Sequence, residues 1–305
     1  MYKRPIALVH APFSGGAGIP GCELAPSALR MAGLSPRLRD AGLWVRDMRP
    51  DFTSCGPVGK AELREVVTAC RRVGSAVAEA LMSNELPILL GGDHSLSIGS
   101  IAAVSNHCRK LRQPLWILWF DAHADFNTPS TSPSGNVHGM PAAVVCGDGA
   151  PELLNLSRNY PMVSPERLHL VGVRTMDTGE EARVRESAAN LLTMDQVHHQ
   201  GLLCVVDSIL EQVAASDGHL HLSFDVDAMD PVVAPGVGTP EKGGLGVDEM
   251  RRCLQRIEDS GLLGSLDVME FNPLHDNYGV TARLVVDLLE NLLGEPVAVS
   301  SAGAL

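Results

Sequence analysis

Seven strand-length runs of apolar residues recur along this chain, with helix-like segments between them. The runs cover residues 6–9, 43–45, 87–90, 115–120, 168–173, 219–224 and 262–269. Alternation of this kind predicts repeated strand–helix–strand units, which set strands parallel to one another. We therefore expect an α/β fold in which helices cover both faces of a mainly parallel sheet.

Two segments between these runs show helical patterns. Residues 60–82 carry apolar residues at helical spacing without a proline, and residues 195–215 begin at a candidate N-cap, Asp195, and continue as an amphipathic helix. No linker rich in serine, glycine or proline divides the sequence into halves of different composition, and no repeat of fixed period is present. Residues 1–305 are therefore expected to form one domain.

The composition disfavours several classes of protein. With 45% hydrophobic and 20% charged residues, the chain resembles an ordinary globular protein. No apolar stretch approaches the roughly 20 residues of a membrane helix, so we expect a cytoplasmic protein. Seven scattered cysteines without a Cys-x-x-Cys spacing indicate reduced thiols. A net charge of -12 disfavours nucleic acid and membrane partners and favours a cationic substrate.

Acidic and histidine side chains follow three of the predicted strands. Asp-Ala-His-Ala-Asp occupies residues 121–125, Asp-Val-Asp residues 225–227, and Gly-Gly-Asp-His residues 91–94. Sites in α/β sheets form where the strands end, and alternate residues of an extended chain point the same way. The candidate metal ligands are His94, Asp121, His123, Asp125, Asp225 and Asp227.

The residue types of this set indicate the kind of metal. Four carboxylates and two imidazoles without a thiolate favour a hard divalent ion such as manganese over structural zinc. Six ligands exceed the needs of one open site, which indicates two ions that share bridging carboxylates around a water. A single Asp-x-Asp is more often a turn or helix cap, but three such motifs at three strand ends would bury many carboxylates at great cost without cations. The set predicts a binuclear metal hydrolase.

Other glycine- and proline-rich segments are candidate sites. The loops at residues 127–141 and 230–246 directly follow the acidic clusters, which is where substrate contacts are expected. Residues 16–21 match a dinucleotide-binding pattern, but Pro20 lacks the N–H that such a loop offers to phosphate. Nucleotide binding is therefore not favoured.

These motifs resemble those of the ureohydrolase family. The resemblance spans nearly the whole chain and rests on residues 91–95, 121–125 and 223–231; residues 126–129 and 134–139 make it most similar to the arginases. It implies a three-layer α/β/α fold around an eight-stranded parallel sheet and two Mn²⁺ ions per subunit. It also implies hydrolysis of L-arginine to L-ornithine and urea by a hydroxide that bridges the ions.

The resemblance also assigns roles to individual residues. One ion would bind His94, Asp121, Asp125 and Asp225, and the other Asp121, His123, Asp225 and Asp227. Asp125 would accept the proton of the nucleophile, His138 would act as general acid or proton shuttle, and Glu270 would pair with the guanidinium. By similarity, Asn127, Ser134 and Asn136 would bind the substrate carboxylate, Asp177 and Glu180 its ammonium, and Thr239 would lie near the guanidinium.

Some of these assignments have simpler interpretations. Alone, Asn127 and Asn136 would be turn residues, His138 a solvated loop histidine and Glu270 a surface charge. Thr175 and Met176 replace a more acidic sequence found in many arginases, which bears on ammonium recognition.

Alternatives for the function remain at this point. The chain could be an agmatinase, a guanidino-acid hydrolase, a formimidoylglutamase, or a non-catalytic regulator that binds arginine. Asp125, His138 and Glu270 argue against the last, because a binding module needs no proton shuttle. The family resemblance also suggests a homotrimer or homohexamer.

Overall fold

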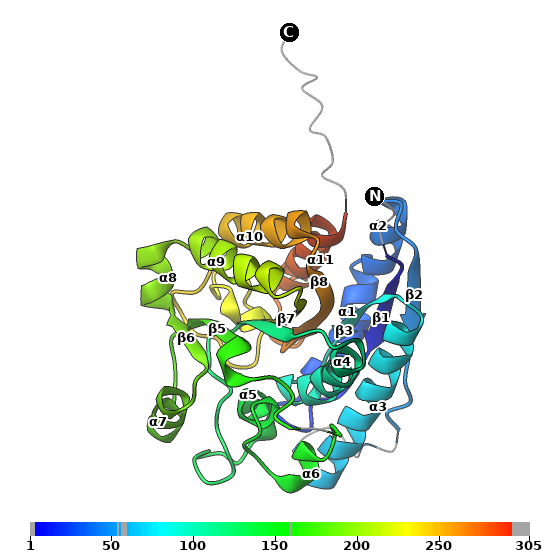
Figure 1. The fold of residues 1–305 in the computed structure, drawn as a ribbon. Coiled ribbons are helices and arrows are strands. Elements are labelled where there is room, and N and C mark those ends of the chain that lie inside the picture. Colours follow the sequence, from blue (N-terminus) through cyan, green and yellow to red (C-terminus); the bar gives the residue numbers. More distant parts are fainter. Residues whose placement is uncertain (1–3, 54, 56–59, 159, 295–305) are drawn as a thin grey trace.

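The computed structural model describes residues 4–53, 55, 60–158 and 160–294. Within them, one sheet of eight parallel strands has the order β2-β1-β3-β8-β7-β4-β5-β6 (Figure 1). The strands are β1 (Ile6–His10), β2 (Val45–Met48), β3 (Leu86–Leu90), β4 (Leu115–Phe120), β5 (Leu168–Val173), β6 (Asn190–Thr193), β7 (His219–Asp225) and β8 (Leu263–Met269). The predicted three-layer α/β/α fold is confirmed.

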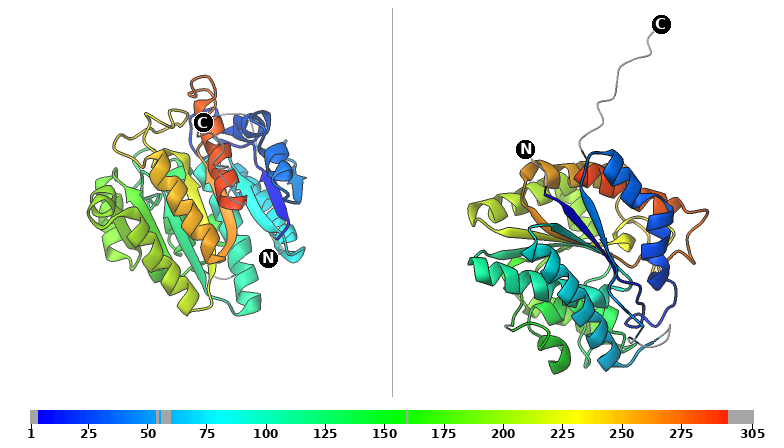
Figure 2. Two further views of the ribbon diagram at one scale, coloured as in Figure 1. Left: turned by 90° about the horizontal axis from the view of Figure 1, so that it is seen from above. Right: turned by 90° about the vertical axis from the view of Figure 1, so that its right-hand side faces the viewer.

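Helices form a layer on each face of the sheet (Figure 2). The first layer contains α3 (Leu63–Met82), α4 (Ser97–Leu111), α5 (Pro141–Val145) and α6 (Pro151–Leu154), and α7 (Thr178–Glu186) adds Val184 to its core. The second layer contains α1 (Ala25–Met31), α2 (Leu34–Asp40), α8 (Met194–Gln200), α9 (Leu202–Ala215), α10 (Val247–Ser260) and α11 (Val280–Leu293). The sheet thus separates two apolar cores.

Side chains of the central strands alternate between these cores. In β4, Ile117 and Trp119 pack with the α3 and α4 layer, whereas Leu118 and Phe120 pack with the opposite layer. All four side chains are buried completely. A parallel strand covered on both faces needs apolar residues at every position, which explains why the strands appear in the sequence as continuous apolar runs.

Several predicted elements differ in extent from the observed ones. β2 begins at Val45, the last residue of the predicted run at 43–45, and continues to Met48, and the half-buried edge strand β6 was not among the predicted runs. The predicted helix at 195–215 is two helices, α8 and α9, with Thr193 rather than Asp195 as N-cap. They are separated by Gly201, whose φ of 83° lies in the left-handed region that glycine adopts readily and that ends a helix.

The strand order places the ends of four strands in one row. β3 and β4 follow each other in the sequence but are separated in the sheet by β8 and β7, which are formed much later in the chain. β8 pairs with β3, and β7 pairs with both β8 and β4, all in parallel. The carboxyl ends of β3, β8, β7 and β4 are therefore neighbours at what we call the carboxyl edge, the usual place for a site in such a sheet.

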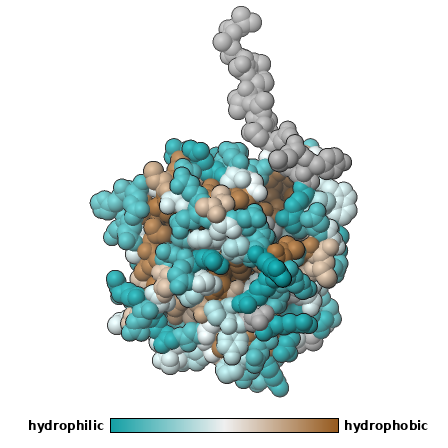
Figure 3. All heavy atoms as spheres, viewed as in Figure 1, coloured by the Kyte–Doolittle hydropathy of each residue, from teal (hydrophilic) through white to brown (hydrophobic). Residues whose placement is uncertain are grey.

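The surface carries both polar and apolar side chains. Figure 3 shows mainly hydrophilic residues on one face, with hydrophobic patches between them. None of the described helices combines the length and apolar character needed to cross a membrane.

A close contact between α3 and α4 leads to a prediction about stability. A Cβ added to Gly99 would lie 2.1 Å from the carbonyl oxygen of Cys70, in the backbone of α3. We expect Gly99→Ala to lower the free energy of unfolding by about 1–3 kcal/mol, because one helix must shift. Chemical denaturation measures this, with Ser75→Ala, at an exposed position of α3, as the control. Equal stability of the two variants would contradict the prediction.

Candidate metal centre and substrate site

His94 follows β3 and is held from two sides. Its ring stacks on Trp119 of β4, with 4.4 Å between ring centroids and an interplanar angle of 19°. Its Nε2 lies 2.9 Å from the hydroxyl oxygen of Ser223 on β7. With the ring fixed and Nε2 engaged, Nδ1 is the atom that faces the acidic residues.

Three carboxylates converge on this nitrogen. Nδ1 of His94 lies 2.9 Å from Asp225 Oδ2, 3.1 Å from Asp125 Oδ2 and 3.3 Å from Asp121 Oδ2. All four side chains are buried. One N–H cannot satisfy three carboxylates, so this arrangement fits ligands around a shared cation. His94, Asp121 and Asp225, which can each offer one ligand atom, form what we call the first cluster.

A second cluster adjoins the first. It consists of Asp121, His123 and Asp227, whose potential ligand atoms also lie within 4.8 Å of one another. His123 Nδ1 is 3.1 Å from Asp227 Oδ2 and 3.5 Å from Asp121 Oδ1. Asp121 belongs to both clusters and is fully buried, so it lies where a bridging ligand would be needed.

The backbone of the 121–125 segment is not extended, so that part of the sequence interpretation was wrong. β4 ends at Phe120, and Asp125 has a φ of 51°, which turns its carboxylate toward His94. Glu270, directly after β8, has a φ of 61°. Left-handed conformations are costly for residues other than glycine and occur preferentially at functional sites.

The clusters carry an excess of buried negative charge. Burial and the neighbouring Asp121 raise the pKa of Asp125 to about 7. Burial, Asp227 and Asp121 also raise the pKa of Asp225 well above its usual value. Although burial opposes a charged imidazole, the carboxylates of Asp227 and Asp121 raise the pKa of His123 to about 12. Each shift shows that the site gains from additional positive charge, which metal ions would supply.

The clusters open into a pocket of about 200 Å³ at the carboxyl edge. Asp125, His138 and Glu270, the three residues expected to be catalytic, line it. His94 and Asp121 are not among the lining residues and lie buried. The structure brings all six expected substrate contacts to the same pocket, namely Asn127, Ser134, Asn136, Asp177, Glu180 and Thr239.

His138 and Glu270 form a pair in the wall of this pocket. His138 Nδ1 lies 3.1 Å from Glu270 Oε1, which also accepts a hydrogen bond of 2.8 Å from the backbone N–H of His94. Burial disfavours the charged form of His138, but the charge of Glu270 and this hydrogen bond outweigh it and raise the pKa of His138 to about 9. His138 is therefore protonated at neutral pH and can act as a proton donor.

The opposite wall is built from residues that bond to one another. Asn127 Nδ2 donates to Asp177 Oδ2 at 3.0 Å, and Glu180 accepts from the backbone N–H of Asp177 at 3.2 Å. Asn136 Nδ2 donates to the carbonyl of Ala17 at 2.7 Å. These hydrogen bonds place amide groups and carboxylates side by side and hold them in position without a bound substrate.

Sequence reasoning missed several residues at the site. Ser223 and Trp119 orient His94, and Ser132 lines the pocket; Thr175 and Met176, which the sequence indicated only as a departure near the ammonium site, line it as well. Ser223 lies two positions before Asp225 on β7, so the alternation of side chains along a strand could have placed it on the same face. The stacking of Trp119 on His94 had no such signal, because Trp119 lies in β4 and His94 follows β3, two strands that are not adjacent in the sheet.

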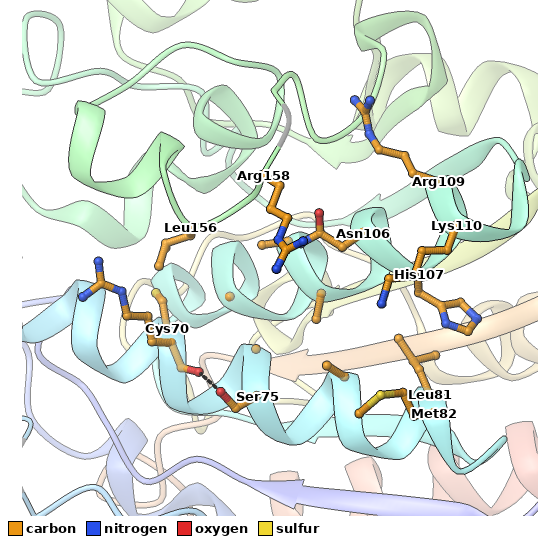
Figure 4. A pocket seen from close by; sticks show the side chains of 16 residues that line it. Cys70, Ser75, Leu81, Met82, Asn106, His107, Arg109, Lys110, Leu156 and Arg158 are labelled. Carbon is orange, nitrogen blue, oxygen red and sulfur yellow. Dashed lines mark hydrogen bonds between the residues drawn. The ribbon is translucent and has the colours of Figure 1, made fainter.

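A larger hollow lies away from this edge, in a groove between α3 and α4 (Figure 4). Its volume is about 670 Å³, and its lining includes Arg71, Lys110 and Arg158. No aspartate or glutamate is among the described residues that line it, and His107 is its one histidine. The groove lacks the ligand set found at the carboxyl edge, so size alone does not locate the chemistry.

Comparison with known proteins agrees with this geometry. The sequence model of the arginase family matches residues 4–294. The chain belongs to the arginase family. The arginase of Bacillus subtilis (strain 168) is 36% identical over 296 residues, which cover 96% of this chain and 98% of that protein. This protein is therefore an arginase-family hydrolase.

Solved structures of arginases share the fold. The crystal structure of the Bacillus subtilis arginase matches this structure with a TM-score of 0.89 and 35% sequence identity. The match covers 96% of this chain and 100% of that one. An arginase of Entamoeba histolytica, solved in complex with L-ornithine, has a TM-score of 0.89 and 29% identity, covering 97% of this chain and 99% of that one.

The raised pKa of His123 predicts that metal binding releases protons. At neutral pH this imidazole is protonated in the metal-free protein, whereas a metal ligand must be neutral. Binding of Mn²⁺ should therefore release protons, and the apparent affinity should rise with pH. Isothermal titration calorimetry in buffers of different ionisation enthalpy measures the number released. A binding enthalpy independent of the buffer would contradict the prediction.

Proposed function

We propose that this chain hydrolyses L-arginine to L-ornithine and urea with two Mn²⁺ ions per subunit. The observation that carries the proposal is the pocket itself, in which two adjoining clusters of carboxylates and histidines face a wall of amides and acids. Support also comes from the Entamoeba histolytica arginase, a relative of the same fold that was solved with L-ornithine.

The side chains at the clusters fit manganese. They offer carboxylate oxygens and imidazole nitrogens without a thiolate, the donor types that hard divalent ions accept. His94, Asp121, Asp125 and Asp225 would hold one ion, and Asp121, His123, Asp225 and Asp227 the other. Two such ions would lower the pKa of a water molecule, so that hydroxide would be available as the nucleophile at neutral pH.

Glu270 would fix the guanidinium of the substrate. A carboxylate and a guanidinium pair through two parallel hydrogen bonds, which orient the planar group as well as bind it. Glu270 is oriented for this by the backbone N–H of His94 and by His138. The hydroxyl of Thr239 donates to Asp227 Oδ2 at 3.1 Å, so Thr239 lies beside the second cluster. From there it would limit movement of the substrate guanidinium.

Asp125 and His138 would move the protons. After attack on the guanidinium carbon, Asp125, which lines the pocket, would accept the proton of the nucleophile. Loss of ornithine requires a proton on the departing amine, and the protonated His138 can supply it. The two groups line the same pocket, so both can reach the intermediate.

The α-amino and α-carboxylate groups would be recognised by the opposite wall. Asn127, Ser134 and Asn136 are neutral donors suited to a carboxylate, whereas Asp177 and Glu180 are acids suited to an ammonium. Agmatine lacks the carboxylate and would leave three donors without their acceptor. Unpaired polar groups of this kind allow strong discrimination between substrates.

The proposal extends to the domain organisation, the cellular location and the oligomeric state. We propose that residues 1–305 form one catalytic domain, which the single sheet supports. We further propose that the protein acts in the cytoplasm as a homotrimer or homohexamer, as the family resemblance suggests.

The first test compares two substrates. With Mn²⁺ bound, we expect urea release from L-arginine at least about a hundredfold faster, in kcat/KM, than from agmatine, because the amide donors recognise the carboxylate. A colorimetric urea assay with a chelator-treated control measures this. Preference for agmatine would refute the assigned roles of Asn127 and Asn136. No turnover of either would refute the proposed reaction and direct attention to other guanidino and formimino compounds.

A second prediction separates proton transfer from metal binding. His138→Asn should retain Mn²⁺ and lower kcat by about 10²–10⁴, the usual contribution of a positioned acid or base. Asp225→Ala, as the comparison variant, should lose metal and activity together. Manganese content by elemental analysis and steady-state kinetics decide the outcome. Unchanged turnover in His138→Asn would exclude it as the proton donor.

A further inference from the structure

Arg174 stands directly after β5, next to the residues that line the pocket. Its guanidinium is partly buried and donates to five backbone carbonyls rather than to a carboxylate. Nη2 donates to Asp227 at 2.6 Å, to Glu241 at 2.9 Å and to Met229 at 3.4 Å, and Nη1 to Gly172 at 3.1 Å and Ala228 at 3.4 Å. One side chain therefore joins three separate segments of the chain.

Two of these segments contribute to the site. Asp227 provides a carboxylate to the second cluster, and Glu241 lies two residues after Thr239. The backbone of Arg174 also bonds near this cluster, since its N–H donates to the carbonyl of Ala122 at 2.8 Å. The N–H of Ala122 in turn donates to Asp227 Oδ1 at 3.0 Å. Arg174 thus bonds to Asp227 directly and to its carboxylate through Ala122, whereas none of the five side-chain hydrogen bonds of Arg174 reaches His94, Asp121 or Asp225 of the first cluster.

The loop that carries Thr239 is shaped around this guanidinium. A Cβ added to Gly244 would lie 2.7 Å from Arg174 Nη2 and 2.7 Å from the backbone nitrogen of Asp230. The carboxylate of Asp230 accepts from the backbone N–H of Gly243 at 2.8 Å and of Gly244 at 3.2 Å, which closes the loop. Glycine is therefore required where the loop passes Arg174.

We propose that Arg174 is a positioning residue that holds the Asp227 turn and the Thr239 loop together and thereby sets the affinity of the second cluster for its metal ion. A planar guanidinium with a fixed fork of donors can reach several carbonyls at once, which a compact ammonium cannot. The inference rests on the proposed two-ion centre. The effect of Arg174 on metal binding is independent of the proposed reaction and substrate, whereas its effect on KM is not.

Arg174→Lys tests the proposal because it keeps the charge and removes the fork. We expect one Mn²⁺ ion to bind as in the unaltered protein and the other about 10- to 100-fold more weakly, the usual effect of losing a group that orients metal ligands. Elemental analysis after dialysis at graded Mn²⁺ concentrations measures both ions. At saturating Mn²⁺, the KM for L-arginine should rise more than kcat falls.

Two further variants keep the test decisive. Gly244→Ala should reproduce the selective loss by displacing Arg174 or the loop, and it does not depend on the folding of Arg174→Lys. Arg185→Lys, at an exposed ion pair with Glu181 in α7, should bind both ions normally. Equal affinity for the weaker ion in Arg174→Lys and the unaltered protein would overturn the proposal.

Other outcomes are equally informative. Parallel weakening of both ions, with a lower melting temperature without metal, would show a general structural role and overturn the proposal. An unaltered protein that binds a single ion would refute the binuclear centre and this inference with it. If the unaltered protein binds two ions but does not hydrolyse L-arginine, the proposed reaction fails while the metal measurements still decide the role of Arg174.

Discussion

The main physical constraint on this structure is that the fold buries several mutually repelling carboxylates close together. Asp121, Asp125, Asp225 and Asp227 come from two strand ends and meet within a few ångströms, where water cannot solvate them. The protein alone compensates by holding protons, as the raised pKa values of Asp125 and His123 show. Such a cluster is costly unless cations occupy it. The carboxyl edge therefore has the electrostatics of a metal site even without a bound ion.

The sheet supplies the geometry that this cluster requires. β7 and β8 insert between β3 and β4, and the apolar packing on both faces fixes their register. The site residues at the end of β7 and at or shortly after the ends of β3, β8 and β4 are thereby positioned by four buried strands. The left-handed conformations of Asp125 and Glu270 persist because this rigid surrounding offsets their cost.

Around this rigid edge, polar contacts orient the groups that would carry out the reaction. Glu270 is hydrogen-bonded to the backbone of His94 and to His138, so the residue expected to hold the guanidinium is coupled to the metal ligands and to the proton donor. Arg174 joins the second cluster to the loop of Thr239 through backbone carbonyls. The site is thus organised by contacts between segments that are distant in the sequence.

The sequence alone determined the α/β class, the positions of most strands, and the motif residues that the structure gathers at the carboxyl edge, because burial and ligand chemistry leave local patterns. It did not reveal the edge strand β6, which is short and half-buried, or the break at Gly201, where a single residue outweighs a continuous apolar pattern. Only the tertiary structure decided that Trp119 and Ser223 orient His94, that Asp125 turns toward it, and that Arg174 joins three segments. These contacts depend on which strands become neighbours, and strand order is set by packing across the whole sheet rather than by any local pattern.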